Sequence, residues 1–243
     1  PYLKSLGVTT VEFMPVYEFE EMVLPKVSPL PDYLKWESKE VDKIKPQIAE
    51  PTGRVNCWGY VPGSYFAPKA SYSSTPRADI EWKTLIRELH KNKMECVMEL
   101  FFDEKVNQNI ILDALRFWVR EYHVDGFHVK GENIQMEQLA TDPLFQDTKL
   151  IYEGFDTGRI YGKKELPVYK NLGFYDEHYL YATRKFLKGD DNMIRETQKN
   201  FYASSPYYGI IHSLANYNTL TMWDMVSYDR KHNEDNGEEN RDS

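Results

Sequence analysis

The chain has 243 residues, of which 41% are hydrophobic and 14% aromatic, enough for a sizeable core in one α/β unit. Its formal net charge of −8 argues against nucleic acid as a partner, because proteins that bind nucleic acid normally carry a basic patch. No apolar run approaches the ~20 residues that cross a bilayer, and no signal peptide is visible, so no membrane partner is expected and a cytoplasmic location is favoured.

Strand and helix patterns alternate along the chain, as in parallel β/α proteins. Strands are expected at 8–15, 95–102, 124–129, 149–153 and 209–214, and helices at 79–93, 107–122, 176–188 and 190–202. Asp79 is the expected N-cap of the first helix. Helical spacing predicts two apolar faces, Ile80, Leu85, Ile86 and Leu89 in the first helix and Ile111, Leu115, Trp118 and Val119 in the second.

Two segments interrupt this alternation. Residues 24–56 are rich in Pro and Lys and are predicted to be a long loop, and residues 232–243 are predicted to be an acidic, Asn-rich loop or tail. The acidic run 234–242 does not follow EF-hand spacing, and Cys57 and Cys96 lack metal-ligand spacing, so no metal and no cofactor are expected. The two cysteines are expected to be buried thiols rather than a disulfide.

Five segments spread along nearly the whole chain carry recognisable motifs: 2–17 (YLKSLGVTTVEFMPVY), 58–72 (WGYVPGSYFAPKASY), 112–130, 150–156 (LIYEGFD) and 226–242. In this order they resemble the debranching group of the α-amylase family, that is, the pullulanases, isoamylases and glycogen-debranching enzymes of glycoside hydrolase family 13. An ordered set of matches is far more specific than one short motif.

The resemblance implies a partial TIM-type (β/α) barrel, approximately strands two to seven of the eight-stranded α-amylase catalytic barrel. The first strand, the eighth strand and the usual C-terminal β-domain have no counterpart in this sequence. Residues 1–243 are therefore expected to be a single, truncated barrel domain, with flanking strands or domains of a longer chain as its partners. Unpaired sheet edges are expected to leave the isolated chain marginally stable.

The motif that carries the family's nucleophile is altered. Family members read VDGFRFD, and residues 124–130 read VDGFHVK, so Lys130 stands where the resemblance places the Asp that attacks the sugar. Glu153 stands at the position of the general acid/base. A retaining glycosidase needs two carboxyls about 5 Å apart. Since a protonated amine is no nucleophile, we expect impaired hydrolysis and an ion pair between Lys130 and Glu153.

Other positions of the family pattern are altered as well. His128 stands where the family has the Arg that orients the nucleophile. Asn218, after Tyr217, stands where the family has the Asp that stabilises the transition state, and an amide cannot stabilise its positive charge in the same way. Only residues 104–108 remain of a segment that walls the substrate cleft in debranching enzymes.

Aromatic side chains of the 58–72 loop are candidates for sugar contact. By the resemblance, Tyr60 is the platform under the sugar at the cleavage point, and Trp58 and Tyr65 lie in the same loop. Each could equally be a packing residue, and for Trp58 packing is favoured. His128 and Tyr217 complete the candidate substrate-binding residues, and for His128 a position in the core or at its rim is also open.

Three hypotheses about function remain open. The favoured one is an α-amylase-family domain of α-glucan, glycogen or starch metabolism that binds an α-glucan, or is a structural part of a longer chain, without efficient hydrolysis. The second is an active α-1,6- or α-1,4-glucan hydrolase of debranching type, with Glu153 as acid/base and a displaced carboxylate such as Glu132 or Asp156. The third is a non-functional gene remnant.

Overall fold

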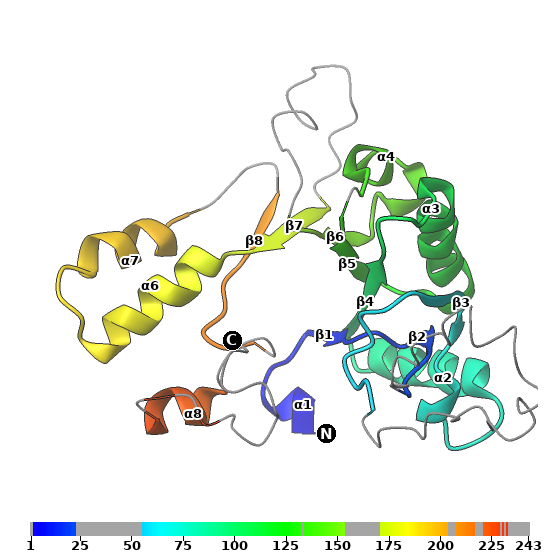
Figure 1. Ribbon diagram of the computed structural model, residues 1–243, viewed down its shortest axis with the longest axis horizontal. Coiled ribbons are helices and arrows are strands. Elements are labelled where there is room, and N and C mark those ends of the chain that lie inside the picture. Colours follow the sequence, from blue (N-terminus) through cyan, green and yellow to red (C-terminus); the bar gives the residue numbers. More distant parts are fainter. Residues whose placement is uncertain are drawn as a thin grey trace, which may run out of the picture. The chain divides into compact units, whose positions relative to one another are not determined.

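The computed structural model describes residues 2–22, 55–132, 134–153, 171–203, 208–216 and 221–228, together with 230 and 232. The chain divides into two compact units, residues 1–135 and 136–243, which are drawn in Figure 1 and are described one at a time below. Nearly all of the predicted loop 24–56, and the predicted tail 232–243 apart from His232, lie outside the described residues.

The first unit is built on a parallel sheet of three strands, β1 (Thr10–Phe13), β4 (Glu95–Phe102) and β5 (Gly126–Gly131), with β4 in the middle (Figure 1). The short helix α1 (Tyr2–Ser5) precedes β1. An antiparallel pair, β2 (Tyr17–Phe19) and β3 (Gly63–Pro68), forms a separate small sheet, and the 3-10 turn η3 (Ala70–Tyr72) follows it.

Alternation along these strands separates an apolar face from a polar one. On β1, the Phe13 ring packs edge-on against Trp82 of the helix α2 (Ala78–Lys91), with 5.0 Å between ring centroids. Successive strand residues point to opposite faces, so Glu12 lies on the face away from α2. The register then places Glu99 of β4 opposite His128 of β5, on the same face as Glu12.

The predicted helix α2 is present, but its start and its apolar face differ from the prediction. Arg77 is the N-cap, and Asp79 lies in the first turn, where its carboxylate interacts favourably with the helix dipole. Ile86 and Leu89 are buried as predicted, whereas Ile80 and Leu85 are 48% and 40% exposed. The prediction was wrong for these two because helical spacing does not reveal how far the neighbouring elements extend over a face.

The second predicted helix is α3 (Gln108–Phe117), which continues into the π-helical turn η4 (Trp118–Tyr122). The Asn107 side chain accepts a hydrogen bond from the Asn109 N–H, which makes Asn107 the N-cap. The helix ends at His123, whose φ of 59° is left-handed. Its predicted apolar face is largely confirmed, since Ile111, Leu115 and Trp118 are buried and Val119 is half-buried.

The second unit contains three further parallel strands in the order β6 (Lys149–Ile151), β7 (Leu172–Tyr175) and β8 (Gly209–Ile211). Its helices are α4 (Met136–Ala140), the 3-10 turn η5 (Pro143–Phe145), α6 (Glu177–Lys188), α7 (Ile194–Phe201) and α8 (Met222–Ser227). The strand β7 was not predicted. Helix α6 is capped by Asp176 and ends at Gly189 with a φ of 92°.

Both cysteines are free thiols. Cys96 is buried as predicted, but Cys57 is exposed, so the prediction of a buried thiol was wrong for Cys57. It lies in the loop before β3, and a cysteine's type alone does not reveal whether a loop position is covered. Among the described residues, no helix is long and apolar enough to span a membrane.

Candidate functional site

A polar cluster lies on the inner face of the first unit's sheet, the face away from α2. His128 Nδ1 lies 2.6 Å from Glu12 Oε1 and 3.8 Å from Glu99 Oε1. Glu99 and His128 are 1% and 2% exposed, and Glu12 is half-buried. Three adjacent strands therefore hold two carboxylates around one imidazole, with Glu99 and His128 nearly out of contact with water.

Tyr60 and Lys130 connect this cluster to the loop before β3. The Tyr60 hydroxyl donates a hydrogen bond of 2.5 Å to Glu99 Oε2. The Lys130 ammonium lies over the Tyr60 ring, 5.6 Å from its centroid, which is a cation–π geometry. The structure thus brings together three residues that the sequence singled out separately, Tyr60, His128 and Lys130, and adds two that it did not, Glu12 and Glu99.

The electrostatics of the cluster centre on Glu99. Burial raises the pKa of the Glu99 carboxyl, because a charge is poorly solvated in the interior. The hydrogen bond from Tyr60 and the positive charge of Lys130 act in the opposite direction, and a hydrogen bond with Glu12 adds to the rise. The positive charge of Lys130 therefore favours the ionised form of Glu99, against the effect of burial.

The other aromatic candidates differ in exposure. Trp58 is 45% exposed and its ring is stacked near Tyr60, with 6.5 Å between centroids and an interplanar angle of 22°. The favoured interpretation of Trp58 as a core residue was therefore wrong. Tyr65 is 7% exposed and packs against Phe102 and Tyr17, with centroid distances of 4.7 Å and 5.2 Å. Sugar contact by Trp58, Tyr60 or Tyr65 stays a prediction.

The remaining predicted site residues are not part of this cluster. Glu132 is exposed and follows Gly131, which ends β5 with a φ of 128°, so Glu132 does not continue the strand. Glu153 belongs to the second unit, where it is exposed two residues after β6. The ion pair between Lys130 and Glu153 would join the two units and stays a prediction. Asp156, Tyr217 and Asn218 lie outside the described residues.

Sequence reasoning missed Glu12 and Glu99 because neither stands at a motif position to which the motif comparison gave a role. A signal for them exists nonetheless. Both are charged residues inside runs otherwise typical of buried strands, TVEF and ECVMELFF. A charge in such a run requires a partner, because an unpaired buried charge is very costly. That rule predicts a polar cluster without saying which strands supply the partners.

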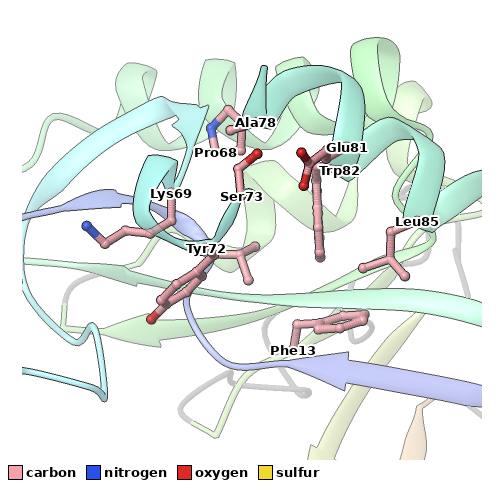
Figure 2. A pocket seen from close by; sticks show the side chains of 10 residues that line it. Phe13, Pro68, Lys69, Tyr72, Ser73, Ala78, Glu81, Trp82 and Leu85 are labelled. Carbon is pink, nitrogen blue, oxygen red and sulfur yellow. The ribbon is translucent and has the colours of Figure 1, made fainter. Parts of the chain in front are cut away.

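A separate hollow of about 320 Å³ lies on the other face of β1, between β1 and α2. Figure 2 shows the Phe13, Trp82 and Leu85 side chains within it, with Glu81 and Lys69 near its edge. None of the predicted site residues lines this hollow. It is therefore distinct from the cluster of Glu12, Glu99 and His128.

The alternation of parallel strands and helices, with polar residues gathered on the inner sheet face, defines a protein of the (β/α)-barrel class. Active sites of such barrels lie at the C-terminal ends of the strands, and Lys130 and Gly131 close β5 at that end. No protein-family model matches the chain.

The chain is similar to curated isoamylases and to GlgX homologs. The chain is 25% identical to the chloroplastic isoamylase 1 of Oryza sativa subsp. japonica, which it matches over 99% of its own length and 38% of the relative's. It is 26% identical to the glycogen operon protein GlgX homolog of Haemophilus influenzae, over 99% of the chain and 43% of that protein. The chain spans about two fifths of the length of these relatives.

Solved structures of pullulanases are similar to this chain in fold. The pullulanase from Paenibacillus barengoltzii, in complex with maltohexaose and α-cyclodextrin, matches with a TM-score of 0.62 and 18% identity, over 93% of this chain and 43% of that one. The Group B Streptococcus pullulanase SAP matches with a TM-score of 0.60 and 17% identity, over 93% and 36%. The predicted partial TIM-type barrel and the resemblance to the debranching group of the α-amylase family are thereby confirmed.

Proposed function

We propose that the chain is an α-glucan-binding domain of debranching type that does not hydrolyse glucan efficiently. The observation that carries this proposal is the environment of Lys130. By its motif it occupies the nucleophile position, and its ammonium lies 5.6 Å from the centre of the Tyr60 ring and acts on the buried Glu99. An amine at this position cannot form the labile glycosyl ester that a retaining glycosidase makes with a carboxylate.

The carboxylates near Lys130 are poor substitutes for the missing nucleophile. Glu99 is 1% exposed and accepts a hydrogen bond from Tyr60, and Glu12 is held by His128 at 2.6 Å. A glycosyl ester requires a carboxylate oxygen that reaches the sugar carbon. Glu132 is exposed, but it follows the turn at Gly131 and so does not project from the strand as Lys130 does.

Glucan binding is supported by a different set of residues. Trp58 and Tyr60 form a stacked aromatic pair with one member 45% exposed, and aromatic faces bind sugar rings through apolar contact. The comparison proteins include a pullulanase in complex with maltohexaose and one in complex with maltotetraose. A malto-oligosaccharide is therefore the ligand class to test.

The test is calorimetric titration of maltoheptaose and of a branched maltosaccharide into the full chain, with reducing-sugar release measured in the same samples. We expect binding without release. Replacing Trp58 with Ala is expected to weaken binding about tenfold, the size of one lost aromatic contact. Trp223→Ala is the matched control, because Trp223 is 74% exposed and belongs to the other unit.

Two outcomes would contradict the proposal. Sugar release that disappears in Glu153→Gln would mean that the chain is an active hydrolase in spite of Lys130, which is the second hypothesis. The absence of any heat of binding in a chain that is folded by circular dichroism would exclude the binding role. It would leave a structural role in a longer chain or a gene remnant.

A further inference from the structure

Glu12, Glu99 and His128 come from three neighbouring strands, and a ligand atom from each lies within 4.8 Å of the other two. We propose that these three side chains form a binding site for a divalent transition-metal ion of the zinc class. This inference does not depend on glucan binding by Trp58 and Tyr60, because its ligand is an ion and its three ligating side chains are others.

The distances are close to those of a metal site. In a tetrahedral zinc site with bonds of about 2.0–2.1 Å, neighbouring ligand atoms lie about 3.3 Å apart. His128 Nδ1 lies 2.6 Å from Glu12 Oε1 and 3.8 Å from Glu99 Oε1, one shorter and one longer than that value. Lengthening the first distance by about 0.7 Å and shortening the second by about 0.5 Å would bring both to the spacing of a zinc site. Rotation of the side chains can supply changes of this size.

The cluster is built on rigid elements and has outer support. All three residues belong to hydrogen-bonded parallel strands, so the positions of their Cα atoms are fixed. Tyr60 donates its hydroxyl to Glu99 Oε2, while Oε1 is the oxygen that faces His128. Hydrogen bonds of this kind orient metal-binding carboxylates by occupying the oxygen that does not bind the ion.

The ligand set favours zinc-class ions over calcium or magnesium. One imidazole nitrogen with two carboxylate oxygens is a mixed set typical of zinc and related transition metals. Calcium takes about six to eight oxygen ligands, so at these two carboxylates it would need several water molecules, which such a buried site has little room to hold. Three protein ligands leave one tetrahedral position for a water molecule or another small ligand.

Charge supports the binding of a dication, with one opposing neighbour. Metal ligands bind in their deprotonated forms, so with an ion bound the two carboxylates and the neutral imidazole would carry two negative charges, which a divalent ion neutralises. Lys130 acts on Glu99 with a positive charge of its own, so it must weaken the affinity for the ion. Removing that charge is expected to tighten binding, whereas removal of any ligand is expected to loosen it.

The experiment is titration of the full chain with Zn²⁺ by calorimetry, together with Co²⁺ absorption spectroscopy to report the ligand geometry. It is carried out in a Cys57→Ser background, because Cys57 is an exposed free thiol that would bind these ions by itself. We expect one ion per chain with a Kd below about 10 μM. Ca²⁺ and Mg²⁺ at the same concentrations are expected to give no signal.

Four variants locate the site. His128→Gln is expected to weaken binding by more than about 100-fold, and Tyr60→Phe by about tenfold through loss of the outer hydrogen bond. Lys130→Met is expected to tighten it several-fold. His90→Gln is the matched control, because His90 forms a similar contact of 2.7 Å with Asp125 in the same unit but at the surface.

The proposal is overturned by the absence of stoichiometric Zn²⁺ binding, by unchanged affinity in His128→Gln, or by binding of Ca²⁺ in preference to Zn²⁺. If His128→Gln does not fold, Lys130→Met and Tyr60→Phe decide the matter. Tighter Zn²⁺ binding in Lys130→Met together with weaker binding in Tyr60→Phe supports the site. Unchanged Zn²⁺ affinity in both variants refutes it.

Discussion

Lys130 and Gly131 are the last two residues of β5, and they constrain the site in different ways. Lys130 contributes a positive charge that acts on Glu99, and it is predicted to stand at the position where the family motif has a carboxylate. Gly131 determines its geometry, because its φ is 128° and a Cβ there would lie 2.0 Å from the Phe102 carbonyl oxygen. The close approach of β4 and β5 at this point therefore requires glycine.

We predict that Gly131→Ala is more destabilising than Gly7→Ala. Both positions have positive φ, but a Cβ at Gly7 has no heavy atom within 4 Å. Gly7→Ala should cost about 1–2 kcal/mol of unfolding free energy from backbone strain alone. Gly131→Ala should cost about 2 kcal/mol more, because β4 must also move. Urea denaturation followed by circular dichroism measures both, and equal losses would contradict the close approach.

At the scale of single elements, the start of α2 shows how local polar groups fix a helix end. Glu81 lies in the first turn and accepts hydrogen bonds from the N–H and hydroxyl of Ser74, each 3.0 Å long. Hydrogen bonds from Thr75 and Ser74 lower the pKa of Glu81 to about 2. The ionised carboxylate therefore ties the preceding loop to the helix, in place of a side-chain N-cap at Arg77.

This arrangement predicts a pH dependence of stability. Because the folded-state pKa of Glu81 is below the ordinary 4.5, its stabilising contribution is present above pH 4.5 and is lost as the pH falls towards 2. As the pH falls from 4.5 towards 2, the free energy of unfolding should therefore decrease less in Glu81→Gln than in the parent. Urea midpoints at several pH values measure this difference. Glu121→Gln, a change at an exposed carboxylate 3.6 Å from Lys83, is the control. Equal changes of the urea midpoint with pH in the parent and in Glu81→Gln would contradict the role of Glu81.

At the scale of the whole molecule, Trp118 connects segments that are far apart in the sequence. It is fully buried, and its Nε1–H donates a hydrogen bond of 2.7 Å to the Tyr65 carbonyl of β3, 53 residues away. Its ring also contacts Tyr122 and Phe117, at centroid distances of 4.5 Å and 5.5 Å. One side chain thereby fixes the end of α3 against the strand β3.

We predict that Trp118→Ala lowers the free energy of unfolding by about 3–5 kcal/mol, the cost of removing a large side chain from a packed core. Trp223→Ala, at a side chain that is 74% exposed, should change it by less than about 0.5 kcal/mol. The measurement is urea denaturation followed by circular dichroism. A loss as small as that of Trp223→Ala would mean that the contacts around Trp118 contribute little to stability.

The elements that sequence patterns predicted best are those whose own residues specify them. The strand 95–102 was predicted with its observed bounds, and Asn107 and Asp176 mark the starts of α3 and α6 through local hydrogen bonds. The strand β7 was missed because LGFY is short and has no flanking punctuation that distinguishes it from a loop. Its pairing with β6 and β8, which is a tertiary interaction, defines it as a strand.

The sequence by itself determined the family resemblance and the barrel class, and it predicts that Lys130 stands at the family's nucleophile position, because these depend on motifs and on periodicities of a few residues. Only the tertiary structure brought Glu12, Glu99 and His128 together, since strand register joins residues 116 positions apart that no local pattern connects. The exposure of the aromatic side chains likewise depends on tertiary packing. Trp58 lies in the loop before β3 and Tyr65 on β3 itself, where packing against Phe102 and Tyr17 buries Tyr65, whereas Trp58 lies at the surface.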